Sequence, residues 1–266
     1  MKSKSTSKSA QTGGGQVQSL VRGLTVLERL AESSVALNLT EVAERVRLPT
    51  STTHRLLNTL LQLGYVSQDH ERGEWSVGVK AFSVGNAYLK SRDYVSAARP
   101  FMRELVLESG ETCNLAIMQE GGPVFVAQIE CDEMMRMVAK LGSHAPLHAS
   151  GVGKSMLAGE SEAEIRRLLG ADELQEFTPK TITTVGSMWE ELDRIRQQGF
   201  AVDNEEQSMG LRCIAANIYN EYSEVVAAIS ISGPVQRITE GRITELGELV
   251  CNKAESITFS IGGKQP

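Results

Sequence analysis

The stretch from Thr40 to Gly64 constrains the fold most strongly, because its pattern predicts two short helices with a fixed break between them. Leu48-Pro49 ends the first helix, since proline disfavours the helical conformation in the residue before it. Thr50 or Ser51 is then the expected side-chain cap of the next helix, whose leucines recur at helical spacing. The helices predicted here are Glu41–Val46, capped by Thr40, and a second that runs from this cap to Gly64.

The second of these helices begins with short polar and cationic side chains. Such side chains donate hydrogen bonds to phosphate oxygens and to base edges, and Arg55 is the candidate for a pair with guanine. A helix with this N-terminal end is typical of one that enters the major groove of DNA. The alternative is that the residues only cap a surface helix. The candidate DNA-binding residues of the helix are Thr50, Ser51, Thr52, Thr53, His54 and Arg55.

The flanking segments complete a small DNA-binding module. A helix over Ser19–Ala31 precedes the pair, and the runs Tyr65–Ser67 and Glu74–Val77 predict a β-hairpin around a polar turn. In this context the hairpin is a wing, with Arg72 at its tip as a further phosphate contact. We therefore expect a winged helix-turn-helix over residues 17–78, after a disordered polar tail over residues 1–16.

Charge separates the two parts of the 266-residue chain, whose length favours two domains. Residues 1–78 carry nine Lys or Arg and seven Asp or Glu, a net of +2, whereas the remainder, with 18 against 26, has a net of −8. A positively charged N-terminal part and a negatively charged remainder are typical of a small module that binds nucleic-acid phosphates and a larger domain that does not. The four cysteines form no CxxC pair, so we expect a reducing cytoplasm and no zinc site. No membrane span or signal peptide is expected either.

The rest of the chain predicts a linker helix over residues 79–92 and an α+β domain over residues 93–266. Mixed helices and strands with hairpins favour this class over a doubly wound sheet. The expected helices are Asp93–Ser109, Gly153–Ala158, Ser161–Leu169, Val185–Gln198 and Arg237–Ile257. The expected strands are Thr112–Gln119, Pro123–Cys131, Arg136–Lys140, Phe200–Val202, Arg212–Tyr219 and Val225–Ser232.

The segment His148–Ser155 ends in Gly-Lys-Ser but does not predict a nucleotide site. A phosphate-binding loop of that type needs glycine where His148 stands, and it follows an apolar strand that is missing here. A glycine-rich start of a helix still offers free amides, at Gly151 and Val152, to a small anion. The alternative is a tight turn in which glycine allows close packing.

A few polar side chains lie within apolar strands. Ser230 and Ser232 point to one face of their strand, where the hydroxyls need either a polar ligand or backbone carbonyls as partners. Asp203 either belongs to a solvated acidic run or faces a site, and Cys213 is either core or part of that site. Neither has a base or nucleophile partner recognisable in the sequence, so we expect no enzyme, no cofactor and no metal ion.

The chain resembles the IclR family of bacterial transcriptional regulators over roughly residues 16–262. Within the family it is most similar to the glyoxylate-shunt (acetate operon) repressors. The stretches that carry the resemblance are Gly15–Leu20, Pro49–Leu57, Leu147–Lys154, Gly210–Ala215 and Ala227–Ile238. The resemblance implies a winged helix-turn-helix, a linker helix, a GAF-like effector domain, a homodimer or homotetramer, and a small carboxylate effector such as glyoxylate or pyruvate.

The resemblance also implies an effector site. Loop amides and polar strand residues would hold the carboxylate, and the matching positions are Gly151, Val152, Asp203, Cys213, Ser230 and Ser232. The apolar wall falls on Met134, Ala145 and Leu211. Met134 and Ala145 replace leucines of the closest pattern, and the smaller Ala145 would enlarge the pocket. The expected function is a DNA-binding regulator, a repressor, that responds to a small acid; the alternative is an activator of the same family with a different acid.

Overall fold

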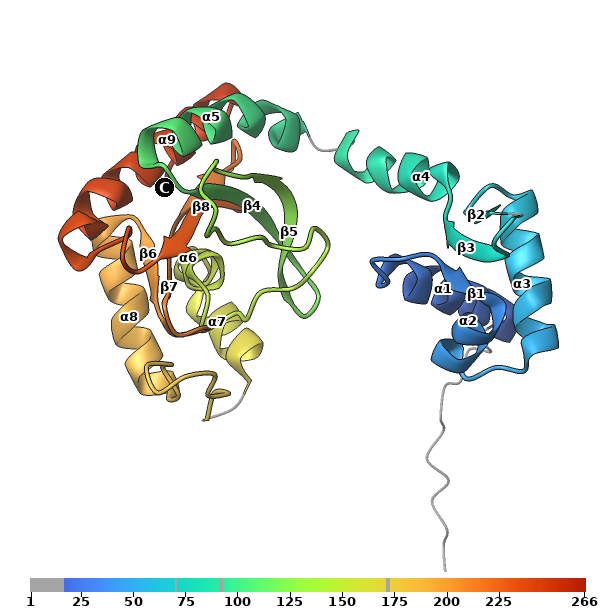
Figure 1. Cartoon of the computed structure of the whole chain (residues 1–266). Coiled ribbons are helices and arrows are strands. Elements are labelled where there is room, and N and C mark those ends of the chain that lie inside the picture. The colour runs from blue at the N-terminus through green and yellow to red at the C-terminus, as the bar shows by residue number, and fades with distance from the viewer. Residues whose placement is uncertain (1–16, 70, 91–92, 171–172) are drawn as a thin grey trace, which may run out of the picture. The chain divides into compact units, whose positions relative to one another are not determined.

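The computed structural model describes residues 17–266 except residues 70, 91–92 and 171–172. The expected tail over residues 1–16, His70 of the wing turn and the expected boundary at Ser91-Arg92 lie outside the described residues. The chain divides into two compact units, residues 1–88 and residues 89–266 (Figure 1). None of the helices in the described ranges is long and apolar enough to cross a bilayer.

The first unit is a three-helix core with a small antiparallel sheet. Its core helices are α1 (Gln18–Ala31), α2 (Leu39–Val46) and α3 (Thr50–Gln62), and its strands are β1 (Leu37–Asn38), β2 (Val66–Asp69) and β3 (Glu74–Val77). Helix α4 (Val79–Lys90) follows the sheet and runs past the end of this unit at residue 88. The strand order is β1-β3-β2, so the predicted hairpin gains a third strand. Val42, Leu57 and the fully buried Trp75 join helices and sheet in one apolar core.

The caps of α2 and α3 correct the expectations. Asn38, not Thr40, caps α2: its side-chain oxygen accepts hydrogen bonds from the amides of Thr40 (3.0 Å) and Glu41 (3.1 Å). The side-chain carboxylate of Glu41 in turn accepts a hydrogen bond from the backbone N–H of Asn38 at 2.8 Å, which completes a capping box. Helix α3 follows Pro49 directly and has no side-chain cap, because Thr50 is already helical.

The second unit is a five-stranded antiparallel sheet with helices on both faces, in the order β5-β4-β8-β7-β6. The strands are β4 (Thr112–Gln119), β5 (Gly122–Ile129), β6 (Ala201–Asn204), β7 (Leu211–Tyr219) and β8 (Val225–Pro234). The helices are α5 (Asp93–Ser109), α6 (Gly151–Ala158), α7 (Glu162–Leu169), α8 (Val185–Gln198) and α9 (Ile243–Ser260), with a short 3-10 turn, η1 (Glu240–Arg242), before α9.

Two expected elements differ in this unit. Residues 136–140 form no strand, because the segment between β5 and α6 is irregular there. The segment contacts β5 through backbone hydrogen bonds only after these residues, around an isolated bridge between Val124 and His144. The last helix begins at Ile243 and not at Arg237. The guanidinium of Arg237 instead binds both carboxylate oxygens of Glu111 at 2.6 Å and holds the turn after β8.

Strand alternation gives the sheet two different faces. One face is mostly apolar: Leu115, Ile214 and Ile229 pack there against α5 and α9, and the polar pair of Asn204 and Arg212 lies at one end of it. The other face carries α6, as Figure 1 shows, and an apolar patch around Val152 and Ala215. The polar strand residues predicted as site residues lie on this second face, so the fold places them under the N-terminal end of α6.

Candidate functional site

The exposed end of α3 forms the first candidate site. Thr50, Ser51, His54 and Arg55 are exposed and Thr52 is half-buried. Thr53 is fully buried, and its hydroxyl donates to the Pro49 carbonyl at 3.2 Å, so its side chain belongs to the core. Arg72 is exposed in the turn of the wing. The first unit therefore presents most of the predicted DNA-binding residues to solvent.

A groove between α1 and α3 adds residues that the sequence did not single out. It encloses about 700 Å³ and is lined by Arg55 together with Arg22, Asn58 and Thr59, among others. The Asn58 amide nitrogen lies 3.3 Å from a ring nitrogen of His54. Helical spacing was the available signal, since residues three and four positions after Arg55 share its face.

The second candidate site is the polar side of the larger sheet. Asp203 pairs with Cys213, Cys213 with Ser232, and Ser232 with Thr112, so the four residues form one row across β6, β7, β8 and β4. Ser230 lies in the next row of the same face. All are buried. The sheet thus brings the predicted polar residues together from three separate strands.

The N-terminus of α6 faces this row. A side chain at Gly151 would lie 3.5 Å from the Cβ atoms of Cys213 and Ala215, so the helix start rests directly on the strand. Ser150 caps the helix by accepting from the Gly153 amide at 3.0 Å. The amides of Gly151 and Val152 precede that capped amide, at the positive end of the helix dipole. This arrangement suits a small anion.

Asp203 supplies the carboxyl group of the row. It is 0% exposed, and its Oδ1 accepts from the amides of Glu206 (2.8 Å) and Gln207 (3.3 Å). Its Oδ2 has no hydrogen-bond partner among the described residues. Burial raises the pKa of Asp203 to about 7, although the two backbone hydrogen bonds act in the opposite direction. Asp203 therefore offers one open oxygen that carries a proton near neutral pH.

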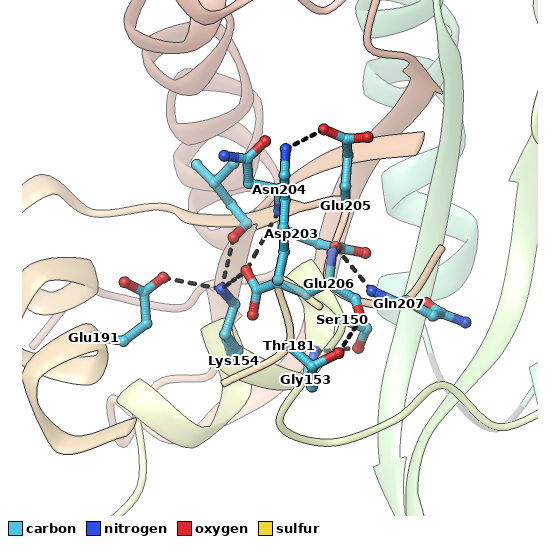
Figure 2. A network of polar contacts seen from close by, with 12 residues as sticks. Ser150, Gly153, Lys154, Thr181, Glu191, Asp203, Asn204, Glu205, Glu206 and Gln207 are labelled. Carbon is cyan, nitrogen blue, oxygen red and sulfur yellow. Dashed lines mark hydrogen bonds and ion pairs between the residues drawn. The ribbon is translucent and has the colours of Figure 1, made fainter. Parts of the chain in front are cut away.

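Lys154 ties the surroundings of Asp203 together (Figure 2). The lysine is fully buried, and its ammonium donates to Glu191 (2.9 Å), to the Val202 carbonyl (2.6 Å) and to Glu206 (2.5 Å). These contacts join α6 to α8 and to the turn that follows β6. Lys154 therefore has its partners within the protein and is not a phosphate-binding lysine. The Gly-Lys-Ser run was the only sequence signal for it.

Cys213 is a buried thiol and not a nucleophile. Burial raises the pKa of the Cys213 thiol far above neutral pH, and the nearby Asp203 charge raises it further. The reactive form of cysteine is the thiolate. The row therefore supplies hydrogen-bonding groups, and no base–nucleophile pair is present in it.

The three residues predicted for an apolar wall lie in different surroundings. Ala145 is buried in the apolar patch with Val152 and Met156. Leu211 is half-buried and lines a pocket of about 340 Å³, with Met137 and Pro234 among its neighbours. Leu211 pairs with Pro234 two residues along the strands from the Cys213–Ser232 pair, on the same face of the sheet. Met134 is 98% exposed and is not part of the buried patch.

Comparison with known proteins identifies both units. The IclR helix-turn-helix domain matches residues 19–70, and the C-terminal domain of the bacterial transcriptional regulator IclR matches residues 86–259. The chain belongs to the IclR family. Members of the IclR family are DNA-binding transcriptional regulators and not enzymes, which confirms the expected class.

Curated relatives and a solved structure extend the match along nearly the whole chain. The chain is 45% identical to the transcriptional repressor IclR of Escherichia coli K12 over 94% of its length and 92% of the relative. It is 44% identical to the transcriptional repressor AllR of the same organism, over 93% and 91%. The Thermotoga maritima IclR structure superposes with a TM-score of 0.82 at 28% identity, covering 93% of this chain and 100% of that one.

Proposed function

We propose that this IclR-family protein is a transcriptional repressor whose binding to operator DNA is controlled by a small carboxylate such as glyoxylate or pyruvate. Repression is supported by two relatives, a transcriptional repressor at 45% identity and an acetate operon repressor at 44% identity. The observation that carries the ligand class is the unpartnered Oδ2 of Asp203, buried in a polar row beneath the start of α6.

Each part of the site has a role in this proposal. The amides of Gly151 and Val152 bind one carboxylate oxygen, and Asp203, with its proton, donates to the other end of the acid. Ser230 and Ser232 donate from β8. Ala145 and the pocket beside Leu211 leave room for a short apolar substituent. The set holds polar groups for one acid and has no positive side chain free for a phosphate.

On the DNA side, α3 enters the major groove and the wing contacts the backbone. A single small module binds DNA weakly, so a homodimer or homotetramer presents two of them to a two-fold-related operator. The acid then favours one arrangement of the protomers over another and changes how the two α3 helices fit the operator.

The test is a gel shift with the DNA upstream of the protein's own gene, combined with thermal melting in a panel of C2–C4 keto and hydroxy acids. We expect the protein to bind that DNA in preference to a scrambled duplex. At least one acid should both raise the melting temperature of the protein and change its binding to that DNA. Dicarboxylates and phosphate esters serve as controls. If no acid of the panel alters melting or DNA binding, the ligand assignment is contradicted. If the protein does not bind the upstream DNA in preference to the scrambled duplex, the proposed regulation of that operator is contradicted.

A further inference from the structure

The polar groups on the α6 face extend beyond the residues proposed to hold the acid. The row next to the polar row, which contains Ser230, continues through Asn114 on β4 and Gln128 on β5, which face each other across the two strands. Asn114 is 0% exposed and Gln128 is half-buried. Neither residue can be explained by packing alone, because a buried amide requires hydrogen-bond partners.

Hydrogen bonds along this extension run in one direction. The Gln128 amide nitrogen donates to the Asn114 carbonyl oxygen at 2.7 Å. The Asn114 amide nitrogen donates to the Ser232 hydroxyl oxygen at 3.2 Å. An amide nitrogen only donates and an amide oxygen only accepts. Gln128 therefore fixes which end of the Asn114 amide faces Ser232.

The consequence concerns the hydroxyl proton of Ser232. Since this hydroxyl accepts from Asn114, its own proton is directed elsewhere. The Cys213 thiol is one neighbour in reach, and a thiol is a weak acceptor. A carboxylate oxygen is a stronger one, because hydrogen bonds to charged acceptors are shorter and stronger than neutral ones. A carboxylate bound in the site therefore accepts a hydrogen bond from the Ser232 hydroxyl.

We propose that Asn114, oriented by Gln128, is a positioning residue that makes Ser232 a hydrogen-bond donor and so selects an anionic carboxylate over a neutral ligand of the same shape. The inference rests on the proposed function, because it concerns the same site. It adds that selectivity for acids is set partly by two residues that do not themselves touch the ligand.

The first experiment is a double-mutant cycle in the full-length protein. Asn114→Leu, which keeps the branched shape but loses both hydrogen-bonding groups, and Ser232→Ala are made singly and together, and calorimetric titration measures the dissociation constants of glyoxylate and pyruvate. Asn114→Leu should weaken binding by about three- to tenfold, as expected for the loss of a neutral hydrogen bond that orients the Ser232 hydroxyl. In the Ser232→Ala background the same change should cost less than about twofold, because the two residues act as one unit.

The second experiment reverses the direction of the hydrogen bonds. In Gln128→Glu the new side chain only accepts, so the Asn114 amide turns to donate to it and presents its oxygen to Ser232. Ser232 then donates to Asn114. We expect the ratio of pyruvate affinity to pyruvamide affinity to fall. Thr258→Val is the matched control: it removes a buried hydrogen bond to Tyr219 and should leave this ratio unchanged.

The outcomes separate the two proposals. If the wild-type protein binds no acid of the panel, the proposed function fails and this inference fails with it. If the wild-type protein binds an acid but Asn114→Leu retains its affinity, only the inference is overturned. An equal loss in both Ser232 backgrounds overturns it as well, since Asn114 would then act through the fold and not through Ser232.

Discussion

Asp203 couples the site to pH because its side chain is buried with one oxygen unpaired. Its pKa is raised from 3.8 to about 7, chiefly by burial. Between these values the native chain holds a proton that the unfolded chain releases. The free energy of unfolding therefore falls as pH rises through this window, and this loss is complete above about pH 7. Glu206 contributes in the same direction, because burial raises its pKa too.

Replacing Asp203 with Asn keeps the size of the side chain and removes its charge. We expect the melting temperature of Asp203→Asn to fall less between pH 5 and pH 8 than that of the wild type, because one group no longer ionises inside the protein. Thermal melts at both pH values measure this difference. Asp193→Asn, at an exposed carboxylate on α8, is the control and should follow the wild type. Parallel pH profiles for all three proteins would contradict the assignment to Asp203.

Arg55 is the residue for which direct base recognition is predicted. It is exposed on α3, beside the groove shared with α1. Arg55→Ala should weaken operator binding by about 1–3 kcal/mol and relax the preference at one base pair, if the guanidinium pairs with guanine. Gel shifts against the operator and single-base variants of it give both quantities. Arg167→Ala, at an exposed ion pair on α7, is the control for lost charge. A uniform loss across all duplexes would assign Arg55 to phosphate contact.

Among the elements, α6 depends on a buried ionic network. Lys154 connects it to Glu191 on α8 and to Glu206 after β6. Removing only the lysine leaves buried carboxylates without their cation, which typically costs about 3–5 kcal/mol. We expect Lys154→Met to lose that much of its free energy of unfolding in urea.

Two further variants interpret this loss. Lys180→Met breaks the partly exposed pair with Glu205 and should cost less than about 1 kcal/mol. The triple variant Lys154→Met, Glu191→Gln, Glu206→Gln should recover part of the loss, since no buried charge then stays unpaired. If Lys154→Met alone is as stable as Lys180→Met, the network is not what holds α6 in place.

Local patterns predicted the elements well, and long-range contacts explain what they missed. Period-two alternation placed Ser230 and Ser232 on one face, helical spacing predicted α3, and two short strand-like runs around a polar turn predicted the hairpin. Lys154 could not be assigned, because its partners lie 37 and 52 positions away in the sequence. Asn114 was missed for the same reason, since Ser232 is 118 positions distant. The error at α2 was local: Asn38 and Thr40 are both good caps, and Glu41 decides in favour of Asn38.

At the scale of the whole molecule, each unit has its own apolar core. We therefore expect calorimetry to resolve two unfolding transitions. A bound ligand stabilises the unit that binds it, so the acid should raise one transition and operator DNA the other. The unit expected to respond to the acid is residues 89–266. A single transition that both ligands shift equally would contradict independent unfolding.

The two-faced sheet also bears on how such a protein diversifies. Residues that alternate along one strand have different roles. One set packs against α5 and α9 and keeps the domain folded, and the other set faces α6 and would contact a ligand bound there. Selection can therefore change the chemical signal to which a descendant responds by altering every second residue of β4, β7 and β8. The hydrophobic half of the same strands is meanwhile constrained by the need to fold, so a new specificity requires no new scaffold.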